Sequence, residues 1–196
     1  MVRRVVTLVL LTVCCAATAL ARGGATRVVL VMPTDPQSGS VRPGYSVTAR
    51  ERGSCWTASI SSSRSDAWRC MSGNEIHDPC YAAKANANVV YCPEPTNGKH
   101  LVAIALAKPL PVARGNRVAG TPQGPPSRII LSGGVTCTFM TGATGLVAGM
   151  RINYGCSDGR MLIGDVDRHA PRWRIFAVAA NGRGEPTYVD IDTAMY

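Results

Sequence analysis

The sequence has no pair of cysteines in the C-x2-C spacing, and its three histidines lie far apart, at His77, His100 and His169. Structural zinc sites usually combine closely spaced cysteine and histidine ligands, so we expect no metal site. The spacing indicates no Ser–His or Cys–His pair either. We therefore predict no catalytic residues, no metal and no cofactor, and we favour a binding role over catalysis.

Clusters of basic residues are also missing. After residue 21 no two Lys or Arg residues are adjacent, whereas nucleic-acid recognition usually needs clustered basic residues interleaved with aromatics, or a known motif. Acidic residues are absent between Pro95 and Tyr154, a stretch that contains six basic residues. We expect no nucleic-acid partner. The partner stays open between an anionic polymer or lipid surface of the cell envelope and an extracellular protein.

The one long apolar stretch lies at the N-terminus, from Val5 to Leu20. Arg3 and Arg4 precede it, and Ala19-Leu20-Ala21 has the small-x-small pattern of a signal-peptide cleavage site. We predict a signal peptide over residues 1–21 and a secreted protein, with an uncleaved membrane anchor as the alternative. Cleavage would remove two arginines and no acid, so the formal net charge would fall from +9 to +7.

Cysteine is common in this chain, which contains eight cysteine residues. Two of the eight cysteines lie inside the predicted signal peptide and would leave with it. An even set of thiols in an exported chain predicts disulfides. Many pairings are compatible with the sequence; we favour near-neighbour pairs, the last of which would tie two successive strands across a hairpin. The six cysteines are Cys55, Cys70, Cys80, Cys92, Cys137 and Cys156.

The chain shows no alternation of strands with long amphipathic helices, so we exclude an α/β fold. Short runs rich in β-branched and apolar residues, separated by turns that contain glycine, predict antiparallel strands in the second half. Residues 51–95 are rich in Ser, Asn and turn signals, so we expect loops there, with short strands at 56–60 and 88–92 and a helical turn near 66–71. Strands in the second half are expected at 127–131, 135–140, 146–154, 161–164, 172–178 and 188–194.

These patterns predict a mainly β fold, a small antiparallel barrel or sandwich with a loop-rich, disulfide-stapled first half. Residues 22–43 open with a short apolar run and continue with many Pro, Gly and Ser residues, so we expect a flexible N-terminal arm. Residues 44–196 would form a single disulfide-stabilised β domain, with a surface loop at 111–127 between its two halves. We expect a monomer.

Two short motifs resemble enzyme signatures, but their context favours hairpin turns. Residues 155–159 match G-x-S-x-G, whose chemistry needs the serine on a turn from a strand into a helix. Residues 142–149 resemble a phosphate-binding glycine loop, which must also open a helix. A strand-like run follows each motif.

One resemblance to a known group of proteins covers the chain from about Tyr45 to its C-terminus. The string GSCWTASISSSRSDAWRCMSGNEIHDPCY at 53–81, with Val90-Tyr91-Cys92-Pro93, resembles a segment of exported actinobacterial Cys-rich proteins of uncharacterised function. The stretch 134–173 is similar to the second half of the same group. The resemblance implies secretion and a shared fold, and it implies no activity, cofactor or catalytic residue.

We expect a secreted, non-catalytic binding protein that acts at the cell envelope or outside the cell. Two alternatives stay open: a secreted hydrolase that uses the Glu75-His77-Asp78 loop, and an inhibitor of an extracellular enzyme that presents residues 71–79 between two disulfides. The tryptophans are expected to pack against a disulfide or the core. The candidate polar or binding cluster consists of Trp68, Glu75, His77, Asp78 and Arg174.

Overall fold

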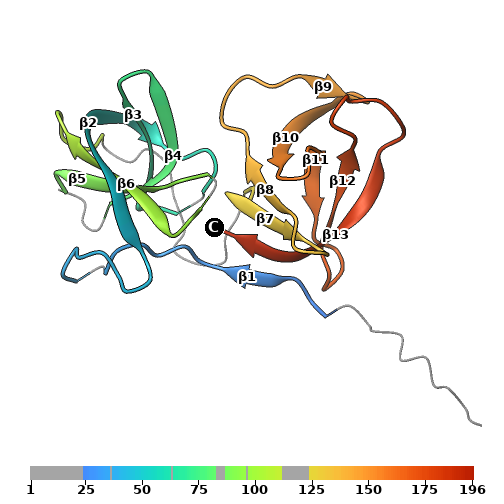
Figure 1. Ribbon diagram of the computed structural model, residues 1–196, viewed down its shortest axis with the longest axis horizontal. Coiled ribbons are helices and arrows are strands. Elements are labelled where there is room, and N and C mark those ends of the chain that lie inside the picture. The colour runs from blue at the N-terminus through green and yellow to red at the C-terminus, as the bar shows by residue number, and fades with distance from the viewer. Residues whose placement is uncertain (1–23, 36, 63, 83–86, 96, 112–123) are drawn as a thin grey trace, which may run out of the picture.

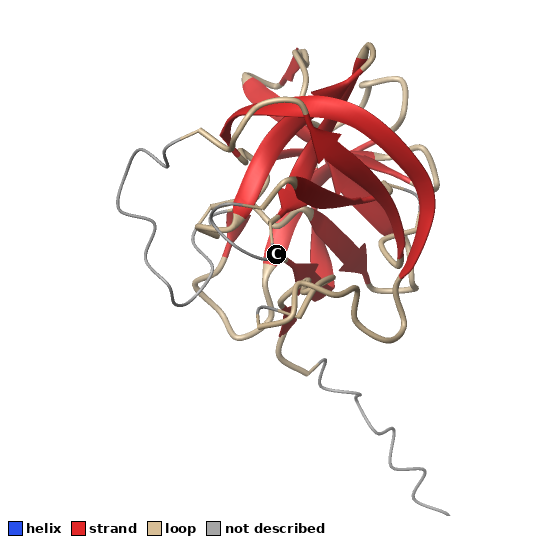
Figure 2. Ribbon diagram, turned by 90° about the vertical axis from the view of Figure 1, so that its left-hand side faces the viewer, coloured by secondary structure: helices blue, strands red, loops and turns tan. Residues whose placement is uncertain are grey.

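The computed structural model describes residues 24–35, 37–62, 64–82, 87–95, 97–111 and 124–196. The predicted signal peptide and most of the loop at 111–127 lie outside these residues. The described residues form strands and loops (Figure 2), and the strands build two barrel-like sheets that lie side by side (Figure 1). The predicted mainly β fold is therefore confirmed. No helix of the described residues is long and apolar enough to cross a membrane.

The first barrel is a closed sheet of five strands. Neighbours in the chain pair antiparallel, and the first and last strands pair in parallel to close the sheet. The expected helical turn near residues 66–71 is wrong, because this segment is a strand. Residues 51–95 are thus more regular than the sequence indicated. The strands are β2 (Ser46–Ala58), β3 (Ala67–Ser72), β4 (Glu75–Tyr81), β5 (Val89–Pro93) and β6 (His100–Leu106).

Sulfur occupies much of the interior of the first barrel. Two disulfides, Cys55–Cys70 and Cys80–Cys92, lie in one buried cluster with Trp68, Val90 and Ile104. Cys55 and Cys70 face each other in the β2–β3 ladder, and both belong to the buried cluster. Their side chains therefore point into the barrel, and the residues next to them on each strand point outward. These bridges confirm the near-neighbour pairing, and several disulfides indicate an extracellular or otherwise oxidising environment.

The second barrel consists of antiparallel strands and closes where β13 (Thr187–Met195) pairs with β7 (Arg128–Leu131). The predicted strand at 146–154 is split by Ala148 and Gly149, which both have positive φ (51° and 75°). The G-x-S-x-G segment lies at the hairpin between two strands, as its context indicated. The strands are β7 (Arg128–Leu131), β8 (Thr136–Phe139), β9 (Leu146–Val147), β10 (Met150–Cys156), β11 (Met161–Asp167), β12 (Arg174–Val178) and β13 (Thr187–Met195).

The core of the second barrel is aliphatic and aromatic. Its fully buried side chains include Ile129, Leu162, Ile175 and Ile191, and Tyr154 packs edge-on against Phe139. The third disulfide joins two cysteines that face each other on β8 and β10. This pair also confirms the predicted near-neighbour order.

The expectation of a flexible N-terminal arm is wrong where the structure describes this segment, because part of it is a strand. The strand β1 (Arg27–Val29) pairs in parallel with the end of β13, through Thr193–Met195. Val31 donates its backbone N–H to the Tyr196 carbonyl at 2.7 Å and is buried. The short apolar run that opens the arm therefore extends the second sheet instead of remaining loose.

Gly53 is required by close packing between β2 and β3. A Cβ at this position would lie 2.1 Å from the Met71 carbonyl oxygen and 3.0 Å from Cγ2 of Ile104. Gly53→Ala should lower the free energy of unfolding by about 3 kcal/mol, because a backbone atom cannot move aside. Urea denaturation measures the change. Gly142→Ala is the control, since nothing lies within 4 Å of its added Cβ; equal effects of the two variants would contradict the clash.

Burial raises the pKa of the Tyr154 phenol well above its ordinary value. In the unfolded chain tyrosine ionises near about pH 10, so the folded state should lose stability as the pH rises above that value. Tyr154→Phe should show a smaller loss of unfolding free energy between about pH 9 and about pH 11. Urea denaturation at several pH values provides the measurement. Identical pH dependence in both proteins would show that ionisation of Tyr154 does not cause the loss of stability at high pH.

Candidate functional site

The five residues predicted as one polar or binding cluster lie in separate places. Trp68 packs inside the first barrel and is 6% exposed. Arg174 lies on β12 of the second barrel, where its guanidinium pairs with Asp167 at 2.9 Å and covers the ring of Tyr188. Glu75 is exposed at the start of β4. The cluster is thus divided between the interior of the first barrel, the start of β4 and the second barrel.

The Asp78 carboxylate fastens the β2–β3 loop to β4. It accepts hydrogen bonds from the hydroxyls of Ser59 and Ser61, the latter at 2.9 Å, and from the backbone N–H of Ile60 at 3.1 Å. Both serines are buried. A carboxylate that satisfies three donors of one loop has a structural role in this geometry.

His77 points into one end of the first barrel and is 8% exposed. Its Nε2 lies 2.9 Å from the Ser72 hydroxyl oxygen and 3.7 Å from a carboxylate oxygen of Glu51. The Ser72 hydroxyl donates to the same carboxylate. Sequence reasoning missed Ser72 and Glu51, although alternation back from the inward-pointing Cys55 places Glu51 on the interior face of β2.

This grouping differs from a catalytic triad. In a triad the serine donates to the imidazole, and the carboxylate holds the other imidazole nitrogen. Here the serine hydrogen goes to Glu51, so the Nε2 atom of His77 donates to Ser72. The carboxylate and the serine both lie on the Nε2 side of the ring. The network satisfies buried polar groups at the end of the barrel and leaves Ser72 without a general base on the imidazole.

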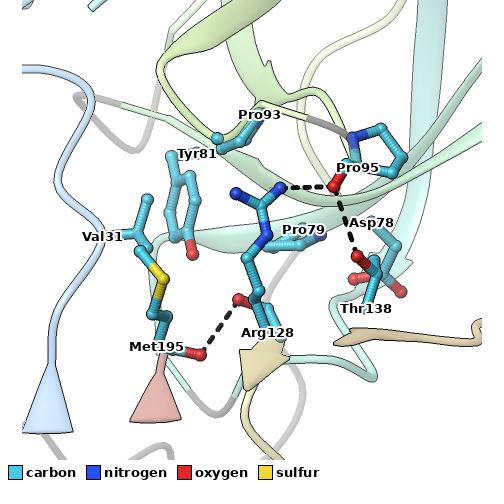
Figure 3. Close-up of a pocket in the computed structure, with 11 residues that line it drawn as sticks. Val31, Asp78, Pro79, Tyr81, Pro93, Pro95, Arg128, Thr138 and Met195 are labelled. Carbon is cyan, nitrogen blue, oxygen red and sulfur yellow. Dashed lines mark hydrogen bonds between the residues drawn. The ribbon is translucent and has the colours of Figure 1, made fainter. Parts of the chain in front are cut away.

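A small cavity lies at the seam between the two barrels (Figure 3). Its volume of about 40 Å³ gives room for a few water molecules. The guanidinium of Arg128 extends from β7 between Pro93 and Pro95, and its Nη2 donates to the carbonyls of Glu94 (2.7 Å) and Pro95 (2.6 Å). Burial lowers the pKa of Arg128. These contacts join the barrels, and the cavity is too small for an organic ligand of ordinary size.

Two larger pockets lie on the flanks of the barrels. One, of about 330 Å³, is lined by Asn153, Tyr154 and Arg168, which donate to the carbonyls of Gly164, Pro126 and Gly124. The other, of about 420 Å³, has a mainly apolar lining at the end of β6. Within the described residues no group of three or more His, Cys, Asp or Glu residues is arranged to hold a metal ion.

Three exposed apolar residues lie on the outside of the first barrel. Met71 and Ile76 face each other across the β3–β4 ladder, and both are more than two-fifths exposed. Trp56, at a bulge in β2, is 46% exposed. We call these residues, with Arg69, the β2–β4 face. The expectation that Trp56 packs into the core is wrong, because the neighbouring Cys55 takes the inward position.

Arg69 connects the β2–β4 face to the second barrel. Its guanidinium carbon lies 5.7 Å from the centroid of the Trp56 ring, and its Nη2 donates to the carbonyl of Thr141 at 2.8 Å. Thr141 follows Met140, another exposed apolar residue. This face could have been predicted from the sequence. Disulfide-bonded cysteines such as Cys55 and Cys70 usually point inward, so the residues beside them on a strand point outward.

Comparison with protein-family models, with curated proteins and with solved structures finds no match. The resemblance to exported actinobacterial proteins thus remains an expectation from the sequence.

Removal of the Asp78 carboxylate tests its structural role. Asp78→Ala should lower the free energy of unfolding by about 2 kcal/mol or more, because the buried serines and the Ile60 N–H lose their acceptor. Asp78→Asn should cost less, since one amide oxygen still accepts. Thermal and urea denaturation give the values. A fully stable Asp78→Ala protein would contradict this assignment.

Proposed function

We propose that this protein is a non-catalytic binding protein that acts outside the cell, at the cell envelope, after removal of a signal peptide. The observation that carries the proposal is the β2–β4 face, where Trp56, Met71 and Ile76 expose apolar area on a rigid sheet. Exposed large apolar residues gathered in one place are typical of interaction surfaces.

The disulfides support binding by this face. The bridge Cys55–Cys70 joins β2 to β3 directly behind it, and Cys80–Cys92 joins β4 to β5. Residues on cross-linked strands lose little conformational freedom when a partner binds, so less of the interaction energy is spent on ordering. A pre-formed surface of this kind suits an extracellular binding protein.

The hydrolase alternative has less support. The residues of the Glu75-His77-Asp78 segment do not converge, because Asp78 holds a loop and His77 points into the barrel. The inhibitor alternative needs a protruding loop between two disulfides. Residues 71–79 instead belong to a hairpin whose strands pair up to Ser72 and Glu75, with only two residues at the turn.

Sedimentation with washed cell-envelope fragments tests the proposal. The mature protein should co-sediment with the fragments, and the variant Trp56→Ala/Met71→Ser/Ile76→Ser should bind at least about tenfold more weakly, because three apolar contacts are lost. The matched control is Leu146→Ser/Tyr188→Ser, which removes exposed apolar residues of the second barrel. The control should bind like the wild type.

Two results would overturn the proposal. One is the absence of envelope binding, or binding that all variants share. The other is turnover of peptidoglycan, ester or peptide substrates that disappears in Ser72→Ala or His77→Ala, since a non-catalytic protein has no such activity.

A further inference from the structure

We infer that the β2–β4 face docks on an anionic lipid bilayer, with Trp56, Met71 and Ile76 inserted at the headgroup level and Arg50 and Arg52 placed against lipid phosphates. The inference rests on the proposed function and specifies its partner. Its basis is the coincidence of exposed apolar side chains with arginines that have no carboxylate partner.

The exposed apolar residues lie on three neighbouring strands of the first barrel. Ser54, Met71 and Ile76 are register neighbours across β2, β3 and β4, and Trp56 follows two residues after Ser54. None of the three pockets described above is lined by Trp56, Met71 or Ile76. The group is presented on the outer surface of a sheet, which fits an extended partner surface better than a single small molecule.

The arginines beside this group carry charge that no neighbour neutralises. Arg50 and Arg52 are exposed and alternate along β2 on the same side as Ser54. Among the described residues neither has a carboxylate within ion-pair distance, and Arg69 donates to a carbonyl. In contrast, Arg160 and Arg174 are paired with Asp158 and Asp167.

This combination matches the chemistry of a bilayer surface. Tryptophan favours the membrane–water interface because its ring is amphipathic. Apolar side chains enter the boundary between headgroups and acyl chains, and arginines gain from an anionic surface potential. Without residues 1–21, which carry two arginines and no acid, the formal net charge is +7, which also favours approach to an anionic surface.

Vesicle co-sedimentation tests the inference with the mature protein. Vesicles that mix phosphatidylglycerol with phosphatidylcholine should bind the protein, and vesicles of pure phosphatidylcholine should bind it far more weakly. Arg50→Gln/Arg52→Gln should weaken binding about 25-fold, from about fivefold for each arginine. The control Arg160→Gln/Arg183→Gln makes the same change in net charge on the second barrel and should have a much smaller effect.

Tryptophan fluorescence provides a second readout that reports on Trp56. Its emission should shift to shorter wavelength on anionic vesicles, because an exposed indole enters a less polar environment, whereas Trp68 is already buried. Trp56→Phe should lose this shift while keeping its fold. Added salt should release the protein, since the charge attraction is screened.

Several outcomes would overturn the lipid assignment. Equal binding to both vesicle types, equal losses in the two arginine double variants, or a spectral shift that persists in Trp56→Phe would each do so. Binding to envelope fragments stripped of lipid that still depends on Trp56 would assign the face to a polymer or a protein. That result would end the lipid inference and leave the proposed function standing, whereas the absence of both kinds of binding would end both.

Discussion

The disulfides of the first barrel provide its interior as well as its cross-links. A closed sheet of only five strands encloses little space, and four half-cystines occupy much of it beside Trp68, Val90 and Ile104. Small domains bury a low fraction of their surface and often need covalent reinforcement. Because each cysteine points inward, its neighbours on β2 and β3 point outward. The position of the sulfur atoms therefore determines which side chains the β2–β4 face exposes.

Arginines that reach backbone carbonyls join the two barrels. Arg128 extends from the second barrel to Glu94 and Pro95, and Arg69 extends from the first barrel to Thr141. A buried cluster of Val31, Ala67 and Tyr81 adds apolar contact at the same seam. A carbonyl acceptor needs no particular side chain on the opposite barrel, but the Arg128 guanidinium needs the space beside Gly98, where an added Cβ would lie 2.5 Å from Nη1.

The mainly β fold, the disulfide pairs and most strands of the second half were predictable because they depend on local alternation, turns and the spacing of cysteines. The closure of the first barrel was not, since it depends on the parallel pairing of β2 with β6, which no local pattern encodes. The candidate site was predicted poorly. Polar residues close in sequence were expected to meet, but Asp78 holds the β2–β3 loop while His77 points into the barrel, and the partners Glu51 and Ser72 of His77 come from other strands.

The pairing of β1 with β13 makes the second sheet discontinuous in sequence. Its first strand precedes the entire first barrel, and the partner of that strand is the last one in the chain. During synthesis the residues of the first barrel precede those of β13, so β1 must wait for the C-terminal residues before it can pair. Completion of the second sheet therefore depends on contacts between the most distant parts of the chain, which are the slowest kind to form.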